Sequence, residues 1–432
     1  MIIHSFGAAG QVTGSCHLVR STQTFLFDCG LFQGTKEVDA QNTQDLPFDP
    51  SELDFVLLSH AHLDHCGRLP LLTQKGFSGP IYTSQASRDI VELMLRDSAK
   101  IQQMQKHPLY SEEDVDNTLS LLYPIEEGSK KTHGQTSFSF YPAGHFLGAH
   151  WIKVKTPEAT IAFSGDLGRY DCPFYPQPYK LGRVDILLLE GTIGSRVHPP
   201  IKEGLNRLYK EVKKCIQKKE TVLIPAFSIG RTEEILSTLV KLALEEENHS
   251  FFDIPIYVDS KLARNGLTLF HKYDNLHKMS LEHLAPDNLY LRDLKETASL
   301  KIEGPKILIS ASGMMEGGPI MVHAKKYLPD KETTVFIVGY QGEETLGRQI
   351  LTGQKEVTIL EADLEVQAKI IEIKGLSGHG DSKDLQRFVS SAQGLKTILL
   401  VHGEASSLQD LKEVFDKDYT VHIQKHNQPF EM

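Results

Sequence analysis

Residues 55–65 read Phe-Val-Leu-Leu-Ser-His-Ala-His-Leu-Asp-His, an apolar run followed by four side chains that can bind a metal ion. The apolar part predicts a buried strand. Side chains two apart on a strand share a face, so His60 and His62 point the same way, and a following turn can bring Asp64 and His65 close to them. Imidazole and carboxylate groups are the usual ligands of Zn²⁺, and a pair of metal ions suits the hydrolysis of phosphate or carboxyl esters. The stretch therefore predicts a metal site at a strand end.

Further candidate ligands stand in similar settings along the chain. His145 lies in Ala143-Gly-His-Phe-Leu-Gly148, Asp166 directly follows an apolar run, and His402 follows another. Small neighbours such as glycine let the backbone approach an ion closely. As a set, these residues predict the completion of two coordination spheres. Asp28, which also follows an apolar run, is expected to orient a histidine or a turn, with direct metal binding as the second interpretation.

The composition of the 432 residues is that of an ordinary globular chain, with 40% hydrophobic and 24% charged residues. This apolar share excludes general disorder, and no apolar run reaches the about 20 residues that span a bilayer, so no membrane partner is expected. The first residues lack the features of a secretory signal. Five cysteines without a CxxC pair indicate a reducing, cytoplasmic compartment. The net charge of −10 argues against a surface covered with basic groups, although carboxylates that bind cations count in this sum.

Short apolar runs alternate with helical patterns and predict an α/β architecture. In the first part of the chain we expect strands at 24–30, 53–60, 79–84 and 160–166 and a helix at 85–106. Later the pattern predicts helices at 203–218 and 231–247 and buried strands at 221–227, 254–260, 306–312 and 333–340. Apolar strands separated by helices are typical of a parallel sheet with helical crossovers. We therefore expect a doubly wound domain inserted at 201–345.

The order of Asp28, the 60–65 run, His145, Asp166 and His402 resembles that of the metallo-β-lactamase superfamily. Further motifs narrow the resemblance to the β-CASP nucleases, which include the nuclease subunit of the cleavage and polyadenylation specificity factor and its bacterial and archaeal relatives. These motifs lie at 190–194, 225–233, 259–263, 309–314, 338–348 and 376–381. The resemblance implies an αββα sandwich, formed by residues 1–200 and 346–432, with an inserted doubly wound β-CASP domain at 201–345.

The resemblance also implies two Zn²⁺ per chain and the residues that hold them. One ion would be held by His60, His62 and His145, and the other by Asp64, His65 and His402, with Asp166 bridging the two. A zinc-activated hydroxide would attack phosphorus. As a ligand of one zinc ion, Asp64 is also expected to be one of the catalytic residues. His379, held by Glu190, is the expected general acid because imidazole titrates near neutral pH.

The implied function is that of a zinc-dependent ribonuclease that hydrolyses phosphodiester bonds of single-stranded RNA in RNA processing or decay. Internal cleavage is the first expectation and 5′-exonuclease activity the second. A histidine at position 402 is typical of the RNA-acting members. Candidate phosphate contacts in the inserted domain are Arg231, Lys261, Arg264, Ser310, Ser312, Gly313 and Arg348. Each basic residue among them could equally form an ordinary ion pair.

Two other functions stay open on the sequence. A small-molecule hydrolase of the same superfamily, acting on esters, thioesters or lactones, would share the metal motif but would not need the insertion. A non-catalytic RNA-binding subunit would not need every ligand position to be filled. The choices between RNA and DNA and between monomer and homodimer are also open. No further domain is expected in the 30 residues that follow His402.

Overall fold

In the computed structural model, the chain forms two compact units. The first comprises Met1–Val197 and Gly378–Met432, and the second His198–Ser377, so that the second unit interrupts the first in the sequence. The structure describes residues 1–104, 106–279, 289–292, 304–426 and 428–432. Among these residues, none of the helices combines the length and the apolar character needed to cross a bilayer.

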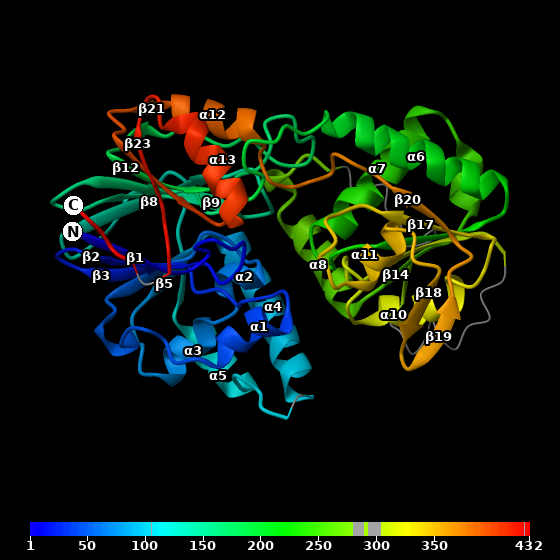
Figure 1. Ribbon diagram of the computed structural model, residues 1–432, viewed down its shortest axis with the longest axis horizontal. Helices are drawn as coiled ribbons and strands as arrows, with labels where there is room; N and C mark the ends of the chain where they lie inside the picture. The colour runs from blue at the N-terminus through cyan, green and yellow to red at the C-terminus, as the bar shows by residue number, and fades with distance from the viewer. Residues whose placement is uncertain (105, 280–288, 293–303, 427) are drawn as a thin grey trace. The chain divides into compact units, whose positions relative to one another are not determined.

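Two seven-stranded sheets form the centre of the first unit. In spatial order, the first sheet contains β24 (Phe430–Glu431), β1 (Ile2–Gly7), β2 (Cys16–Arg20), β3 (Thr24–Phe27), β4 (Phe55–Leu57), β5 (Ile81–Thr83) and β6 (Leu122–Pro124). The second contains β23 (Thr420–Ile423), β22 (Thr397–Val401), β12 (Ile186–Glu190), β10 (Thr160–Phe163), β9 (His150–Lys155), β8 (Thr136–Pro142) and β7 (Lys131–His133). A separate parallel pair joins β11 (Gly182–Arg183) to β21 (Ala392–Gln393). Because β24 pairs with β1, the two ends of the chain lie side by side (Figure 1).

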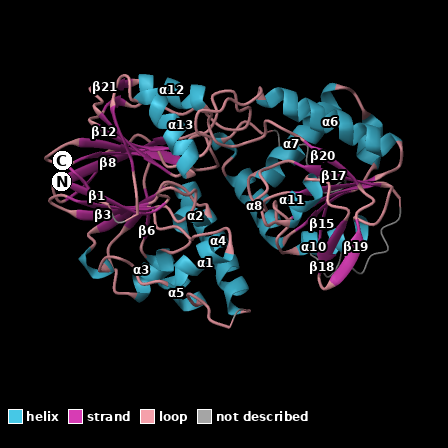
Figure 2. Cartoon of the chain, in the orientation of Figure 1, coloured by secondary structure: helices cyan, strands magenta, loops and turns pink. Residues whose placement is uncertain are grey.

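Helices cover both outer faces of this pair of sheets. They are α1 (Lys36–Asp39), α2 (Leu63–Cys66), α3 (Leu69–Gln74), α4 (Gln85–Gln103), α5 (Glu112–Ser120), α12 (Ser382–Ser390) and α13 (Ala405–Phe415). Figure 2 shows α12 and α13 over the second sheet and α3 and α5 over the first. Between the sheets, Phe25 and Phe55 share one buried core with Phe138, Phe163 and Leu188. This order of layers is the αββα sandwich that the family resemblance implies, and it is confirmed.

The second unit is built on a six-stranded, entirely parallel sheet. Its order is β15 (Leu289–Arg292), β14 (Ile256–Asp259), β16 (Lys306–Ser310), β13 (Thr221–Pro225), β17 (Thr333–Ile337) and β20 (Lys369–Glu372). The described helices of the unit are α6 (Ile201–Gln217), α7 (Arg231–Glu245), α8 (Lys261–Lys272), α10 (Pro319–Tyr327) and α11 (Leu346–Leu351), and β18 (Glu356–Ile359) forms a hairpin with β19 (Ala362–Glu365). All described residues of β13, β16 and β17 are buried, as expected for parallel strands that are covered on both faces. The predicted doubly wound sheet is therefore confirmed.

The observed elements are shorter than the predicted ones at their carboxyl ends. The strand predicted at 24–30 ends at Phe27, because the chain turns at Asp28, which has a φ of 56°. The compact second unit also continues past 345 as far as Ser377, because β20 pairs with β17 and completes its sheet. The compact units are defined by contacts within the chain, and the domain boundaries at 201 and 345 remain predictions.

Candidate metal centre

The candidate ligands of the first unit follow the ends of strands in both sheets. His60 and His62 follow β4, Asp166 follows β10, and His402 follows β22. Strand β4 runs parallel to β3, and β12 runs parallel to both β10 and β22. Within each sheet, the polar residues that follow these strands therefore lie at the same edge, where the strands have their carboxyl ends. His145 comes from the loop between β8 and β9. The fold therefore brings together residues that are up to 342 positions apart in the sequence (His60 to His402).

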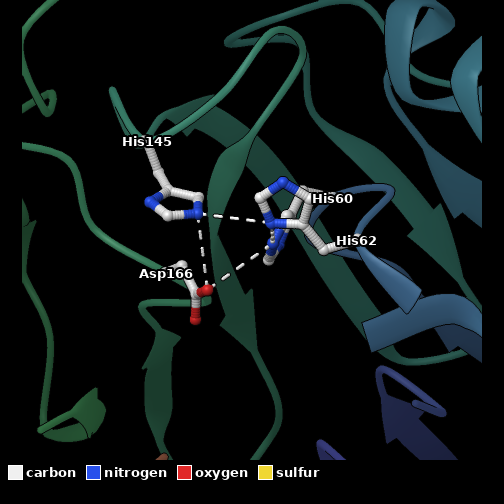
Figure 3. Close-up of side chains that lie close together, drawn as sticks. All are labelled: His60, His62, His145 and Asp166. Carbon is white, nitrogen blue, oxygen red and sulfur yellow. Dashed lines mark hydrogen bonds and ion pairs between the residues drawn. The ribbon is translucent and has the colours of Figure 1, made fainter. Parts of the chain in front are cut away.

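One cluster contains His60, His62, His145 and one oxygen of Asp166 (Figure 3). The Nδ1 atom of His62 lies 3.0 Å from His60 Nε2 and 3.3 Å from His145 Nε2. Asp166 Oδ2 lies 3.6 Å from the Nε2 atoms of both His60 and His145. Four potential ligand atoms thus surround one point.

A second cluster contains Asp64, His65 and His402, and the other oxygen of Asp166 lies beside two of these residues, His65 and His402. The Nε2 atoms of His65 and His402 lie 3.2 Å apart. Asp64 Oδ2 lies 3.4 Å from His402 Nε2, and Asp166 Oδ1 lies 3.2 Å from His65 Nε2. Each oxygen of Asp166 therefore faces a different cluster, and all seven predicted metal ligands lie together.

These distances fit metal ions. A tetrahedral Zn²⁺ with bonds of about 2.0–2.1 Å keeps its ligand atoms about 3.3 Å apart. Asp166 is only 2% exposed, and its Oδ1 lies 3.2 Å from His65 Nε2 and 3.6 Å from His402 Nδ1. A carboxylate buried among imidazoles needs a compensating positive charge, and a cation supplies one. The donor set of imidazoles and carboxylates matches the preference of zinc.

The protonation states also suit metal binding. Burial lowers the pKa of His60 and His145 well below the usual range, and lowers that of His62 to about 4, so these imidazoles are neutral. Burial opposes ionisation of Asp166, but the imidazoles of His402 and His65 outweigh it and hold the pKa of this carboxyl well below the usual range. Burial also opposes the charged form of His65, yet the surrounding carboxylates raise its pKa, so that in the absence of an ion a proton takes the place of the cation.

Asp28 orients two histidines from outside the clusters. Its Oδ2 accepts a hydrogen bond from His65 Nδ1 at 2.7 Å and another from the Ser59 hydroxyl at 2.9 Å. Because Ser59 donates to Asp28, its oxygen accepts from His60 Nδ1, which lies 3.0 Å away. In these tautomers, the Nε2 lone pairs of His60 and His65 face the clusters. The backbone packs closely here: a Cβ at Gly30 would lie only 1.6 Å from the Asp64 carbonyl oxygen.

Thr192 orients the His402 side chain, as Asp28 orients His65. This role of Thr192 was not predicted from the sequence. Its hydroxyl donates to the His402 carbonyl oxygen at 3.1 Å and lies 3.0 Å from His402 Nδ1. The hydroxyl can therefore accept the Nδ1 proton and leave Nε2 for a metal ion. Ser59 was missed as well. Its position directly before His60 was the one available signal, whereas Thr192 is 210 residues from its partner.

A third group joins the clusters on one side. His379 Nδ1 lies 3.2 Å from both carboxylate oxygens of Glu190 and 4.0 Å from Asp166 Oδ2. Burial lowers the pKa of His379, but the charges of Glu190 and Asp166 outweigh this and raise it to about 9. Glu190 is fully buried and accepts a hydrogen bond from the Leu167 backbone amide at 2.7 Å. The predicted pairing of His379 with Glu190 is thus present in the structure.

The candidate phosphate contacts all lie in the second unit. Arg231 forms an ion pair with Glu234 at 2.7 Å, the ordinary role that the sequence left open. Lys261 is exposed and Arg264 half-buried. The Ser312 amide donates to the Gly317 carbonyl at 3.2 Å, so this amide is engaged inside its own loop. The remaining candidates are Ser310, which is buried, and Gly313 and Arg348, whose contacts are described below.

Comparison with known families agrees with this architecture. The model of the metallo-beta-lactamase superfamily matches residues 9–226, the Beta-Casp domain matches 232–350, and the Zn-dependent metallo-hydrolase RNA specificity domain matches 363–424. The chain therefore belongs to the metallo-β-lactamase superfamily. Within that class it is a member of the β-CASP nuclease family, and its metallo-hydrolase domains make it a metal-dependent hydrolase.

Several relatives resemble the chain over most of its length. Ribonuclease TTHA0252 of Thermus thermophilus is 35% identical over 422 residues, which cover 94% of each chain. Transcription termination factor FttA of Methanocaldococcus jannaschii is 29% identical over 94% of this chain and 67% of that protein. Cleavage and polyadenylation specificity factor 73 of Drosophila melanogaster is 28% identical over 96% of this chain and 62% of that protein. A crystal structure from Enterococcus faecalis V583 shares the fold, with a TM-score of 0.58 at 13% identity, over 100% of this chain and 99% of the other.

Proposed function

We propose that the chain is a ribonuclease that uses two zinc ions to hydrolyse phosphodiester bonds of single-stranded RNA. The observation that carries this proposal is the position of Asp166, whose two oxygens each face one cluster of ligand atoms. In this assignment His60, His62 and His145 would hold one ion, Asp64, His65 and His402 would hold the other, and Asp166 would contribute to both. When bound, the ions supply Lewis-acid catalysis: they stabilise charge on phosphoryl oxygens and lower the pKa of water.

The chain itself supplies the proton for the leaving group. His379 is 21% exposed at its side chain and fixed through Nδ1 by Glu190, so Nε2 is the atom that would transfer the proton to the leaving 3′ oxygen. The carboxylates of Glu190 and Asp166 raise the pKa of His379 to about 9, so it carries the proton that a general acid needs, and a dication held nearby would lower this pKa. The products would carry a 5′-phosphate and a 3′-hydroxyl.

RNA is the proposed substrate because of the relatives and the domains. The Thermus thermophilus protein is named a ribonuclease, and the match to an RNA specificity domain spans 363–424. A small-molecule hydrolase would not need the Beta-Casp domain at 232–350. A non-catalytic subunit is disfavoured because all seven ligand positions are filled and lie together. Internal cleavage is proposed first, with 5′-exonuclease activity as the second mode.

The direct test is cleavage of single-stranded RNA labelled at either end. The wild-type chain is expected to release internal fragments, to lose activity with EDTA and to regain it with zinc. Asp64→Ala is expected to lose both activity and bound metal, measured by elemental analysis, whereas the exposed-site control His107→Ala keeps both. Release of mononucleotides from the 5′ end would assign the exonuclease mode instead. A metal-loaded wild type that hydrolyses thioesters or lactones but leaves RNA intact contradicts the proposal.

A further inference from the structure

Two exposed aromatic side chains stand at the carboxyl edge of the six-stranded sheet. Phe227, just after β13, is 51% exposed, and Tyr340, just after β17, is 73% exposed. Among the residues that the structure describes in the second unit, they are the two large aromatic side chains with this degree of exposure. Strands β13 and β17 are neighbours, paired in parallel as Thr221 with Thr333, so their ends lie at the same edge.

The loops that carry these rings are fastened to each other around Gly313. A Cβ at Gly313 would lie 3.3 Å from Phe227 Cδ2, so the ring packs against this backbone. The Gln341 side-chain amide donates to the carbonyl oxygens of Gly313 at 3.0 Å and of Tyr340 at 2.8 Å. Arg348 Nε donates to the Gln341 carbonyl at 3.1 Å, and its guanidinium lies 5.9 Å from the centre of the Tyr340 ring.

This arrangement holds the backbone of both loops in place, although the rings that they carry face solvent. The Gln341 side chain is only 2% exposed and packs against Gly347. A Cβ at position 347 would lie 1.6 Å from Gln341 Oε1, so the amide fits only because residue 347 is glycine. A ring on a fixed backbone loses less entropy when a ligand stacks on it than a ring on a mobile loop. Single exposed apolar residues need no explanation, but two exposed rings on joined loops, one of them near a guanidinium, form a surface suited to flat ligands.

The charges at this edge are of both signs. Exposed carboxylates of Glu343 and Glu344 lie in the loop that carries Tyr340, whereas the Arg348 guanidinium lies near the Tyr340 ring and exposed Lys261 follows β14. Charge alone therefore does not select a ligand here, but every nucleobase has an uncharged face that stacks on aromatic rings. The exposed rings therefore offer a binding surface to unpaired bases.

We propose that Phe227 and Tyr340 form a stacking platform for unpaired bases of single-stranded RNA, with Gln341 as the positioning residue that joins their loops. This inference rests on the proposed function, because it takes RNA as the ligand. It adds base contacts by the two rings to the phosphate contacts expected for Ser310, Ser312 and Gly313.

The test compares base-bearing and abasic competitors of RNA cleavage by the zinc-loaded, full-length chain. The competitors are an oligoadenylate of about 12 nucleotides and a ribose-phosphate chain of the same length without bases. Phe227→Leu and Tyr340→Leu are each expected to weaken competition by the oligoadenylate roughly ten-fold and to leave competition by the abasic chain unchanged. Tyr340→Phe keeps a ring and is expected to restore the wild-type value.

Two controls make the result specific. Tyr123→Leu removes a ring that is 56% exposed in the first unit and is expected to change neither competition constant. Thermal unfolding of each variant checks that its fold is intact. Leucine variants that bind the oligoadenylate like the wild type, or that lose both competitors equally, overturn the platform while the ribonuclease proposal stands. A wild type that neither binds nor cleaves RNA overturns both.

Discussion

The carboxyl edges of the sheets serve different purposes in the two units. In the first unit, strand ends bring imidazoles and carboxylates into a buried cluster, where Asp166 is 2% exposed. In the second unit, strand ends carry aromatic rings out into solvent, where Tyr340 is 73% exposed. A buried polar cluster is stable only with a partner for its charges, whereas exposed rings need none. The first edge is therefore built for a cation and the second for a ligand with a flat apolar face.

The largest effect is expected when the shared carboxylate of the first edge is removed. Asp166→Ala takes a ligand from both clusters, so bound zinc should fall and RNA cleavage should drop by at least roughly 10³-fold. Elemental analysis and cleavage assays measure the two losses. Retention of both metal ions by this variant contradicts the bridging assignment. The stacking variants of the second edge are expected to keep their zinc, which sharpens the contrast between the edges.

A second prediction separates metal binding from proton transfer. His379→Ala is expected to keep its zinc, because this residue touches Glu190 and lies outside the two ligand clusters. Turnover should fall by roughly 10²–10⁴-fold, since the leaving oxygen loses its proton donor. His107→Ala is the matched control. A parallel loss of zinc and activity would instead make His379 a ligand, together with Asp166 and Glu190.

A third prediction concerns a buried carboxyl in the second unit. Burial raises the pKa of Glu233 from 4.5 to about 8, so the folded chain keeps a proton there that the unfolded chain has lost. Stability should therefore fall as the pH rises from about 4.5 to 8, by roughly 3–5 kcal/mol, and change little from this group above 8. Glu233→Gln carries no charge and should lack this part of the dependence.

Calorimetric unfolding of the wild type and Glu233→Gln at several pH values measures this difference. Glu245→Gln, an exposed change on the same helix, is the control and should follow the wild type. Parallel curves for wild type and Glu233→Gln would show that Glu233 is ionised in the folded state.

The smallest effect is expected where a hydroxyl orients one ligand. Thr192→Val removes the group that accepts the His402 Nδ1 proton, and metal affinity should fall by roughly 10-fold. Thr192→Ser keeps the hydroxyl and should bind metal like the wild type. The readout is a zinc titration against a competing chelator. Equal zinc affinities of the wild type, Thr192→Val and Thr192→Ser would show that the Thr192 hydroxyl does not support metal binding.

Local patterns in the sequence predicted the α/β elements, the inserted parallel sheet and a metal site at a strand end, whereas the family resemblance implied the αββα sandwich and the assignment of ligands to two ions. The 60–65 run carries four candidate ligands within six residues, so its chemistry is visible before folding. The part of Thr192 was not predictable, because it depends on a hydrogen bond across 210 residues. Phe227 and Tyr340 were missed for a different reason: aromatic residues next to apolar strands are usually buried, and only the structure shows that these two are exposed.

The central claim is that Asp166 lies between two metal ions. Anomalous diffraction from crystals of the zinc-loaded chain, recorded on both sides of the zinc absorption edge, tests it most directly. Two peaks are expected, one beside His60, His62 and His145 and the other beside Asp64, His65 and His402, with one oxygen of Asp166 next to each. A single peak, or peaks away from Asp166, would contradict the account.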